Sequence, residues 1–253
     1  MMSVAAYFVS DVHLTDASGD RAELFLSFLR RLGADLECTH LFMMGDIFDL
    51  WLSDHQYFQE RYRNVVDQIR RLTMEGVAVH YFEGNHDLYL EKFWGKELGV
   101  DVHPGPINTT LAGLRLRLEH GDELDPDDTG YRFLRWFLRT PVMKMVAHWL
   151  PETLLVRIGE RASQGSRAYT SGYKSQDQAT AREKILAHGR RILATKPYDI
   201  LIAGHIHVRE DREISSGETK HRIVNLGSWM ERPSVFVLTA SEGRWLDLDR
   251  VSK

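Results

Sequence analysis

The sequence contains one cysteine, Cys38, among its 253 residues. A lone cysteine excludes an internal disulfide and any metal site built from several thiolates. No stretch approaches the roughly 20 apolar residues that a membrane-spanning helix needs. The first ten residues lack the basic leader of a signal peptide. We therefore expect a cytoplasmic protein whose metal ligands, if it has any, carry nitrogen and oxygen.

The overall composition is that of a soluble globular protein, with 43% hydrophobic and 27% charged residues. The length suits one large domain, or a domain with a sizeable insertion. Twelve histidines are present, and several occur as close pairs. We find no internal repeat and no low-complexity segment.

Short apolar runs alternate with helical patterns in the first part of the chain. Residues 4–9, 41–44 and 77–82 are typical of buried strands. Residues 20–32 and 55–75 have apolar positions at helical spacing, and each segment is followed by a glycine. This alternation predicts an α/β fold.

The pattern changes after Gly99. Residues 107–112 and 114–119 favour a hairpin, with Arg115, Arg117 and Glu119 on a solvated face. Further along, we expect a loop at 163–175, a helix at 176–195 and a buried strand at 199–203. Three closing strands are expected at 222–226, 234–238 and 245–248.

Metal-binding residue types stand where these strands end, and they are Asp11, His13, Asp46, Asn85, His120, His205 and His207. In open α/β sheets, ligands bind at the carboxyl ends of the strands. Residues two apart in an extended chain project from the same face, so Asp11 and His13 can share one cation, as can His205 and His207. Seven ligands suit two cations about 3.5–4 Å apart with a shared carboxylate. Mixed imidazole and carboxylate ligands favour Mn²⁺, Fe²⁺ or Zn²⁺ over Ca²⁺ or Mg²⁺.

Polar residues beside these ligands suggest catalytic roles. His86 is a candidate proton donor or charge stabiliser, with Asp87 available to orient it, and the alternative is a surface loop histidine. Asp122 is either an acceptor for a ligand histidine or a turn former. Asp49 lies near the loop of Asp46.

One segment is strongly basic. Residues 129–176 carry eight Lys or Arg and two acids, a charge of +6, so the rest of the chain carries about −10. Residues 131–150 are also dense in apolar and aromatic side chains. Two interpretations stay open: a pair of packed helices with a solvated basic face, or a basic amphipathic cap that meets an anionic, lipid-bearing partner.

Five segments together resemble the sequence blocks of the calcineurin-like metallophosphoesterases: D-V-H at 11–13, G-D-I-F-D at 45–49, G-N-H-D at 84–87, H-G-D at 120–122 and G-H-I-H at 204–207. The resemblance implies a four-layer fold, a β-sandwich flanked by helices. It implies a core of residues 1–125 and 177–253 and a helical cap insertion at 126–176. It also implies two metal sites that share Asp46, one completed by Asp11, His13 and His207, the other by Asn85, His120 and His205.

Within the family, residues 48–51, residues 120–131 and the basic insertion resemble the branch that hydrolyses a diacylated UDP-glucosamine in lipid A synthesis. This likeness implies substrate contacts by Asp128, Arg161 and Lys174 in the cap and by Asn85, His86 and His205 in the core. One departure is that the best-known members of that branch have arginine at the position of His86, where histidine is the general family pattern.

The sequence therefore predicts a dinuclear metal hydrolase of a phosphate anhydride, with Mn²⁺ as the expected metal. The favoured substrate is the acylated UDP-sugar, with possible contact at the cytoplasmic face of the inner membrane and no nucleic-acid partner. One alternative is a phosphodiesterase or phosphatase of a soluble nucleotide. Another is a scaffold that binds a partner through the cap, but seven intact ligands argue against it, since mutually repelling carboxylates and imidazoles are costly to gather without a metal.

Overall fold

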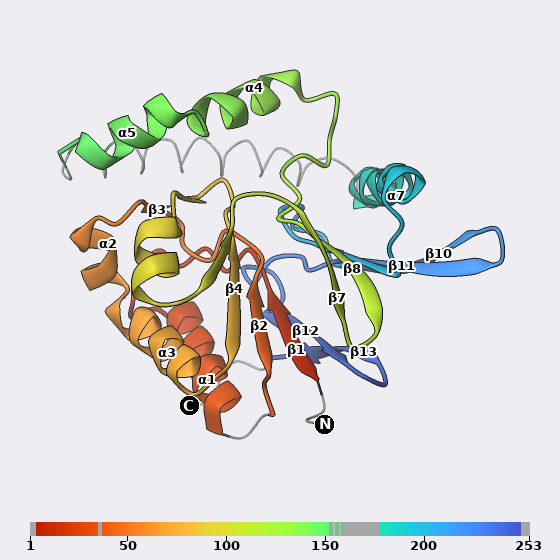
Figure 1. Ribbon diagram of the computed structural model, residues 1–253, viewed down its shortest axis with the longest axis horizontal. Coiled ribbons are helices and arrows are strands. Elements are labelled where there is room, and N and C mark those ends of the chain that lie inside the picture. Colours follow the sequence, from red (N-terminus) through yellow and green to blue (C-terminus); the bar gives the residue numbers. More distant parts are fainter. Residues whose placement is uncertain (1–3, 35–36, 152–153, 155–156, 158–177, 249–253) are drawn as a thin grey trace.

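The computed structural model describes residues 4–34, 37–151, 154, 157 and 178–248. Two β-sheets face one another, and helices cover their outer faces (Figure 1). The first sheet has the strand order β13-β12-β1-β2-β4-β6, in which β1, β2, β4 and β6 are parallel. Its strands are β1 (Ala5–Val9), β2 (His40–Met43), β4 (Ala78–Phe82), β6 (Asp101–His103), β12 (Ser234–Thr239) and β13 (Gly243–Asp247).

The second sheet has the order β10-β11-β9-β8-β7, in which β8, β9 and β11 are parallel and the two edge strands are antiparallel. Its strands are β7 (Ile107–Leu111), β8 (Leu114–Leu118), β9 (Ile200–Ala203), β10 (Glu210–Ser216) and β11 (Thr219–Asn225). The predicted hairpin at 107–119 is confirmed. Two short strands, β3 (Trp51–Leu52) and β5 (Asp87–Leu88), pair separately.

The helices are α1 (Asp20–Ala34), α2 (Gln56–Arg61), α3 (Arg63–Met74), a π-helix η1 (Glu91–Glu97), α4 (Thr129–Leu138), α5 (Pro141–Trp149) and α7 (Gln178–Thr195). The prediction of one helix over 55–75 is wrong, because the chain leaves helical geometry at Tyr62, with φ −112° and ψ 24°. The Tyr62 hydroxyl donates to the Leu14 carbonyl at 2.8 Å, and its ring packs against Phe48. A buried tertiary contact thus interrupts the helix.

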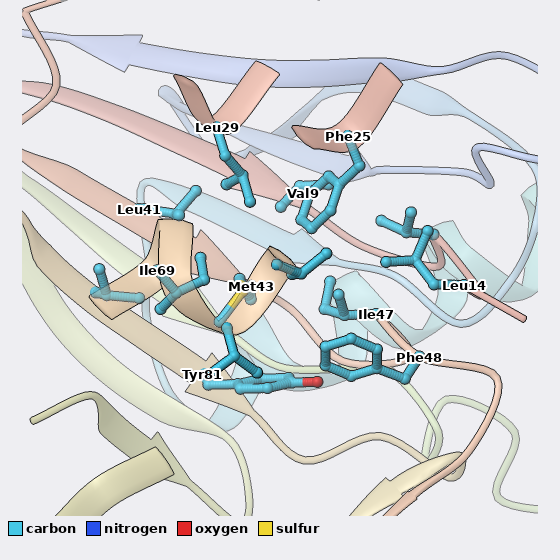
Figure 2. Close-up of a cluster of buried hydrophobic side chains, with 14 of the residues drawn as sticks. Val9, Leu14, Phe25, Leu29, Leu41, Met43, Ile47, Phe48, Ile69 and Tyr81 are labelled. Atoms are coloured by element: carbon cyan, nitrogen blue, oxygen red, sulfur yellow. The ribbon is translucent and has the colours of Figure 1, made fainter. Parts of the chain in front are cut away.

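Three apolar clusters define four layers. The largest lies between the first sheet and helices α1 and α3, where Val9 and Met43 meet Phe25, Leu29 and Ile69 (Figure 2). A second cluster fills the space between the two sheets, and a third lies between the second sheet and α7. The order helix, sheet, sheet, helix confirms the four-layer α/β prediction.

The predicted solvated face of the β8 hairpin holds for Arg115, whose side chain is 53% exposed, but is wrong for Arg117 and Glu119. Arg117 and Glu119 are 6% and 3% exposed. The Arg117 Nε donates to Glu119 at 2.9 Å, and the Glu119 carboxylate also meets His188 of α7. Because α7 covers this face, the two charges pair with each other and with the helix instead of with water.

A pair of substitutions on α3 tests this layer order. Ile69 is fully buried, so Ile69→Ala is expected to lower the free energy of unfolding by about 2–5 kcal/mol through lost contacts and a residual cavity. Met74, on the same helix, is 81% exposed, and Met74→Ala is expected to change stability by less than about 0.5 kcal/mol. Urea denaturation followed by tryptophan fluorescence measures both, and equal effects would contradict the packing.

Candidate metal centre

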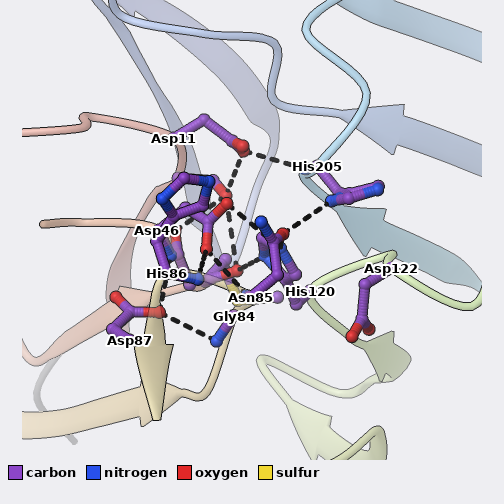
Figure 3. A network of polar contacts seen from close by, with 12 residues as sticks. Asp11, Asp46, Gly84, Asn85, His86, Asp87, His120, Asp122 and His205 are labelled. Carbon is purple, nitrogen blue, oxygen red and sulfur yellow. Dashed lines mark hydrogen bonds and ion pairs between the residues drawn. The ribbon is translucent and has the colours of Figure 1, made fainter. Parts of the chain in front are cut away.

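All seven predicted ligands come together at one edge of the sandwich. Asp11 and Asp46 follow β1 and β2, Asn85 follows β4, His120 follows β8, and both His205 and His207 follow β9. Parallel neighbours deliver their carboxyl ends to the same edge, which explains why residues so distant in sequence meet. Figure 3 shows Asp11, Asp46, Asn85, His120 and His205 pointing toward a common point.

One ligand group at this edge contains Asp11, His13 and His207, and His13 and Asp46 also form a group with His86. The His13 Nε2 lies 3.3 Å from the His207 Nε2, and the latter lies 3.3 Å from the Asp11 Oδ1. The Asp46 Oδ2 approaches the His13 Nε2 at 3.9 Å. Asp46 therefore borders this group.

The second group contains Asp46, His120 and His205. The His120 Nε2 is 3.6 Å from the Asp46 Oδ2. The Asn85 Oδ1 lies 3.2 Å from the His120 Nε2 and 3.1 Å from the His205 Nδ1. The Asp46 carboxylate thus stands between the two groups, as a shared ligand must.

Backbone strain is concentrated at these residues. Asp11, His13, Asp46 and His205 have positive φ values of 51°, 49°, 54° and 66°. Non-glycine residues rarely adopt this conformation, and where they do the strain often serves a functional site. Here it turns four candidate ligands inward from the strand ends.

Two glycines permit the close approach of the loops. A Cβ on Gly84 would lie 2.0 Å from the Asp46 Oδ1, and a Cβ on Gly204 would lie 2.0 Å from the Ser10 Oγ. Any larger residue would push the loop away from the ligand beside it. The glycines of G-N-H-D and G-H-I-H are therefore part of the geometry of the site.

The electrostatics of the site favour bound cations. Asp11 is fully buried, and its Oδ1 has no hydrogen-bond partner within the described part of the chain. Burial opposes ionisation of Asp11, but contacts with His13 and His207 hold its pKa well below the usual range. Burial also opposes charge on His120, yet Asp46 and Asp11 raise its pKa to about 9. Buried carboxylates facing imidazoles form the donor set that a divalent transition metal takes.

The second ring nitrogen of His120 is also fixed. Its Nδ1 donates to the Met44 carbonyl at 2.9 Å, which turns the Nε2 toward Asp46 and Asn85. Metal-ligating histidines generally donate their other N–H to a carbonyl or carboxylate in this manner. The residues present therefore fit a divalent metal centre.

His86 lies beside this centre and is 4% exposed, so the alternative of a surface loop histidine is wrong. Its ring meets that of His13 edge to face at 4.8 Å between centroids. The His86 Nδ1 donates to the Asp49 carbonyl at 2.8 Å, which leaves the Nε2 side for other contacts. Burial, opposed by the Asp46 charge, lowers the pKa of His86.

Asp87 does not orient His86. Its carboxylate accepts the backbone N–H groups of Asp46, Ile47 and Gly84 at 2.9 Å and the Tyr81 hydroxyl at 2.6 Å. Burial, with the Asp46 charge second, raises the pKa of Asp87 to about 6. The expectation that Asp87 orients His86 is corrected: Asp87 ties the loops of Asp46 and Asn85 together, and the Asp49 carbonyl holds His86.

Asp122 lies in the turn of residues 121–124, where the Leu124 N–H donates to the Gly121 carbonyl at 3.1 Å, so the turn interpretation holds, and its side chain has a further contact. Its Oδ2 accepts the Arg135 Nε at 2.6 Å and the Tyr131 hydroxyl at 3.3 Å, both from α4. It therefore anchors α4 to the metal edge. Burial raises the pKa of Asp122, but its neighbours His120 and, after it, Arg135 lower the pKa below the usual value.

Three positioning residues were missed from the sequence. The Ser10 Oγ donates to the Asp11 Oδ2 at 2.6 Å, and the Tyr81 hydroxyl holds Asp87. The Asn225 Nδ2 donates to the Ile206 and Val208 carbonyls and so shapes the G-H-I-H loop. Asn225 also ends a buried strand, the signal that identified the other site residues, so it could have been found.

Helices α4 and α5 lie over this edge (Figure 1). Arg135 and Arg139 point toward the core and pair with Asp122 and Glu83 at 2.6 and 3.0 Å. The expected solvated basic face is thus wrong for these two arginines. Arg132 and Lys144 stay exposed, but most of the exposed side chains on α4 and α5 are large and apolar, namely Phe133, Leu134, Trp136, Phe137, Val142, Met145 and Trp149.

The predicted substrate contacts in the cap are only partly described. Asp128 is the N-cap of α4, and its side chain accepts the Tyr131 N–H at 2.9 Å. Its contact with a sugar stays a prediction. Arg161 and Lys174 lie outside the described residues. Across the described ranges, no helix has both the length and the apolar character needed to cross a membrane.

A cavity of about 250 Å³ opens beside His120 and Asp122, bounded by α4, α7 and the ends of β4 and β8. Its wall includes four guanidinium groups, those of Arg117, Arg132, Arg135 and Arg191. Arg117 and Arg135 are already paired with carboxylates. Four acids stand in the same wall, Glu83, Glu119, Asp122 and Glu123, so the charged lining of the cavity is balanced.

Comparisons with known proteins agree with this geometry. A protein named UDP-2,3-diacylglucosamine hydrolase from Stenotrophomonas maltophilia (strain K279a) is 30% identical, over 97% of this chain and 98% of its own. A protein of the same name from Vibrio vulnificus (strain YJ016) is 27% identical over 92% and 93%. The solved structure of an archaeal phosphodiesterase shares the fold, with a TM-score of 0.50 and 13% identity over 97% of this chain and 100% of that one.

The family model described as calcineurin-like phosphoesterase matches residues 6–209, which include all seven candidate ligands. This match extends over far more than half of the chain and agrees with the four layers and the divalent metal centre. The chain is an enzyme, a metal-dependent phosphoesterase, and it belongs to the calcineurin-like phosphoesterase family.

Proposed function

We propose that this enzyme hydrolyses UDP-2,3-diacylglucosamine to UMP and 2,3-diacylglucosamine 1-phosphate. The observation that carries the proposal is the apolar surface of α4 and α5, placed over a metal centre that fits phosphate chemistry. A diacylated substrate presents a pyrophosphate and two acyl chains close together, and it needs both features. The relatives that carry the name of this activity align over nearly their whole length.

The metal centre is proposed to hold two Mn²⁺ ions. Asp11, His13 and His207 would hold one ion, Asn85, His120 and His205 the other, and Asp46 both. When bound, two divalent cations supply Lewis acidity that neutralises phosphoryl oxygens and makes water a stronger nucleophile. The proposal is supported by the short distances between ligand atoms. The His13 Nε2 lies 3.3 Å from the His207 Nε2, and the His205 Nδ1 lies 3.1 Å from the Asn85 Oδ1.

His86 is proposed to contact the reacting phosphate. The Asp49 carbonyl fixes its ring, and the edge-to-face contact with His13 holds it at the border of the first ligand group. With the Nδ1 proton donated to Asp49, the Nε2 carries a proton only in the imidazolium form, and in that form it can donate to a phosphoryl oxygen or to the leaving group. His86 would thus orient the phosphate and supply a proton from its Nε2.

Residues 126–176 are proposed to form a cap that binds the acyl chains. The cap is held to the core at both ends of its described part: the Arg135 guanidinium meets Asp122, and the Ala147 carbonyl accepts the His55 Nε2 at 2.8 Å. Each buried methylene contributes about 0.8 kcal/mol, so even a few buried acyl carbons can dominate affinity. The same apolar surface, with Arg132 and Lys144 nearby in sequence, is proposed to contact the cytoplasmic face of the inner membrane.

A hydrolysis panel with Mn²⁺ tests the substrate. The acylated UDP-sugar is compared with its deacylated form, with a soluble chromogenic phosphodiester and with a phosphomonoester. Cleavage of the acylated substrate with kcat/KM at least about 100-fold above that for the soluble diester, a difference of about 2.7 kcal/mol, supports the proposal. Equal rates on the acylated and deacylated sugars would favour a soluble nucleotide as substrate.

Asp46→Ala is predicted to remove at least one metal ion per chain and to abolish hydrolysis, because one carboxylate borders both ligand groups. Plasma mass spectrometry of the dialysed protein gives the metal content. Asp67→Ala, which removes a half-exposed carboxylate on α3, is the matched control and should keep metals and activity. Wild-type metal content and affinity in Asp46→Ala would exclude Asp46 as a shared ligand.

His86→Ala is predicted to keep both ions and to lower turnover by roughly 10²–10⁴, the usual effect of losing a group that transfers a proton. His40→Ala removes a histidine on β2 that is not among the candidate ligands, and it serves as the control. The measurement is kcat on the acylated substrate beside metal content. Unchanged turnover would show that His86 has no part in the reaction.

Replacing Trp136 and Phe137, which are 62% and 42% exposed, with serine is predicted to weaken cleavage of the acylated substrate by orders of magnitude. Hydrolysis of the chromogenic diester, which needs only the metals, should be largely unchanged. Met74→Ser, at an apolar residue of α3 that is 81% exposed, is the control. Parallel loss on both substrates in a folded protein would show that the cap is structural and not a lipid groove.

A further inference from the structure

Away from the candidate metal centre, a further group of metal-binding side chains lies at the edge of the first sheet. It consists of His80 on β4 and of Asp101 and His103 on β6. The parallel pairing places His80 opposite Asp101 and Phe82 opposite His103. Because residues two apart on a strand share a face, all three side chains project from the same face of the sheet. The tripeptide D-V-H at 101–103 repeats the one at 11–13.

The three ligand atoms form a nearly regular triangle. The His80 Nδ1 is 3.1 Å from the His103 Nε2 and 3.2 Å from the Asp101 Oδ2, and the last two atoms are 3.5 Å apart. Around tetrahedral zinc, bonds of about 2.0–2.2 Å place neighbouring ligand atoms about 3.3–3.6 Å apart. The separations in the candidate metal centre, 3.3 Å between His13 and His207 and 3.6 Å between His120 and Asp46, are of the same size.

One hydrogen bond from His80 cannot satisfy both of the other atoms of this triangle. A proton on the His80 Nδ1 can point at His103 or at Asp101, but not at both, since an N–H bond has one direction. A cation above the triangle contacts all three atoms at once. Burial, with the His103 ring second, lowers the pKa of His80 to about 4, so the ring is neutral, which is the form that binds metal.

Packing holds both rings in this arrangement. The His80 ring stacks on Phe42 at 4.4 Å and 6° between planes, and Phe82 packs against His103 at 4.6 Å. The side chains of His80 and His103 are 18% and 12% exposed, whereas that of Asp101 is 63% exposed. The site is therefore prearranged on its protein side and open to water on the other.

We propose that His80, Asp101 and His103 bind a third divalent ion of the zinc class, with water at the remaining positions. Two imidazoles and one carboxylate are a common zinc donor set. The ion would join β4 to β6, a three-residue edge strand whose one neighbour in the sheet is β4. This site is separate from the reaction and does not depend on the identity of the substrate.

The test is the metal content of the full chain with Zn²⁺ as the probe. Wild type, His103→Ala and Asp101→Ala are saturated with Zn²⁺, dialysed against metal-free buffer and measured by plasma mass spectrometry. Both variants are expected to hold one ion per chain fewer than wild type. Their hydrolysis of a chromogenic diester at saturating Mn²⁺ should match wild type, because the third ion lies outside the reaction.

Two features of the design keep the result decisive. Asp101 is exposed, so Asp101→Ala is expected to fold even if His103→Ala does not. His40→Ala removes another histidine of the same sheet, whose ring lies 6.1 Å from that of His80, and it should retain the wild-type metal content. Equal metal content in wild type and Asp101→Ala, or an equal loss in His40→Ala, would overturn the proposal.

Discussion

The buried carboxylate of Asp46 is the constraint on which the catalytic edge depends. It is 2% exposed, and its Oδ1 accepts the backbone N–H groups of Asn85 and His86 at 2.9 and 3.0 Å. Its Oδ2 faces His13 and His120. A buried carboxylate beside a second one, Asp11, is costly unless cations compensate it. The loops are therefore arranged to satisfy one oxygen with amides and to offer the other to metal.

Much of this arrangement could be predicted, because it follows from a local pattern repeated along the chain. An apolar run followed by a polar ligand appears at Asp11, Asp46, Asn85, His120 and His205. Parallel strands carry such residues to one edge, so neither tertiary contacts nor distances were needed to group them. What the pattern cannot give is the interruption at Tyr62 or strand β10, whose sequence E-D-R-E-I-S-S has little strand character and is held by pairing with β11.

The incorrect assignments share one cause, which is that neighbours in sequence need not be neighbours in space. Asp87 follows His86 directly, but adjacent residues at the start of β5 point to opposite faces, so Asp87 meets Tyr81 and the loop amides. The spacing of Arg117 and Glu119 correctly places them on one face. That α7 covers this face depends on a helix some 60 residues later in the sequence, which no local pattern reveals.

The charge of residues 129–176 shows the same limit in its most consequential form. The +6 of residues 129–176 suggests a basic outer surface, yet Arg135 and Arg139 meet the acids Asp122 and Glu83 of an oppositely charged core. These partly buried ion pairs hold α4 over the edge of the sheets that carries the candidate metal ligands. The two arginine charges therefore face acids of the core and not solvent. Because the arginines turn inward, the apolar side chains turn outward. Charge pairing with the core thus accompanies a surface of α4 and α5 on which most of the exposed side chains are apolar.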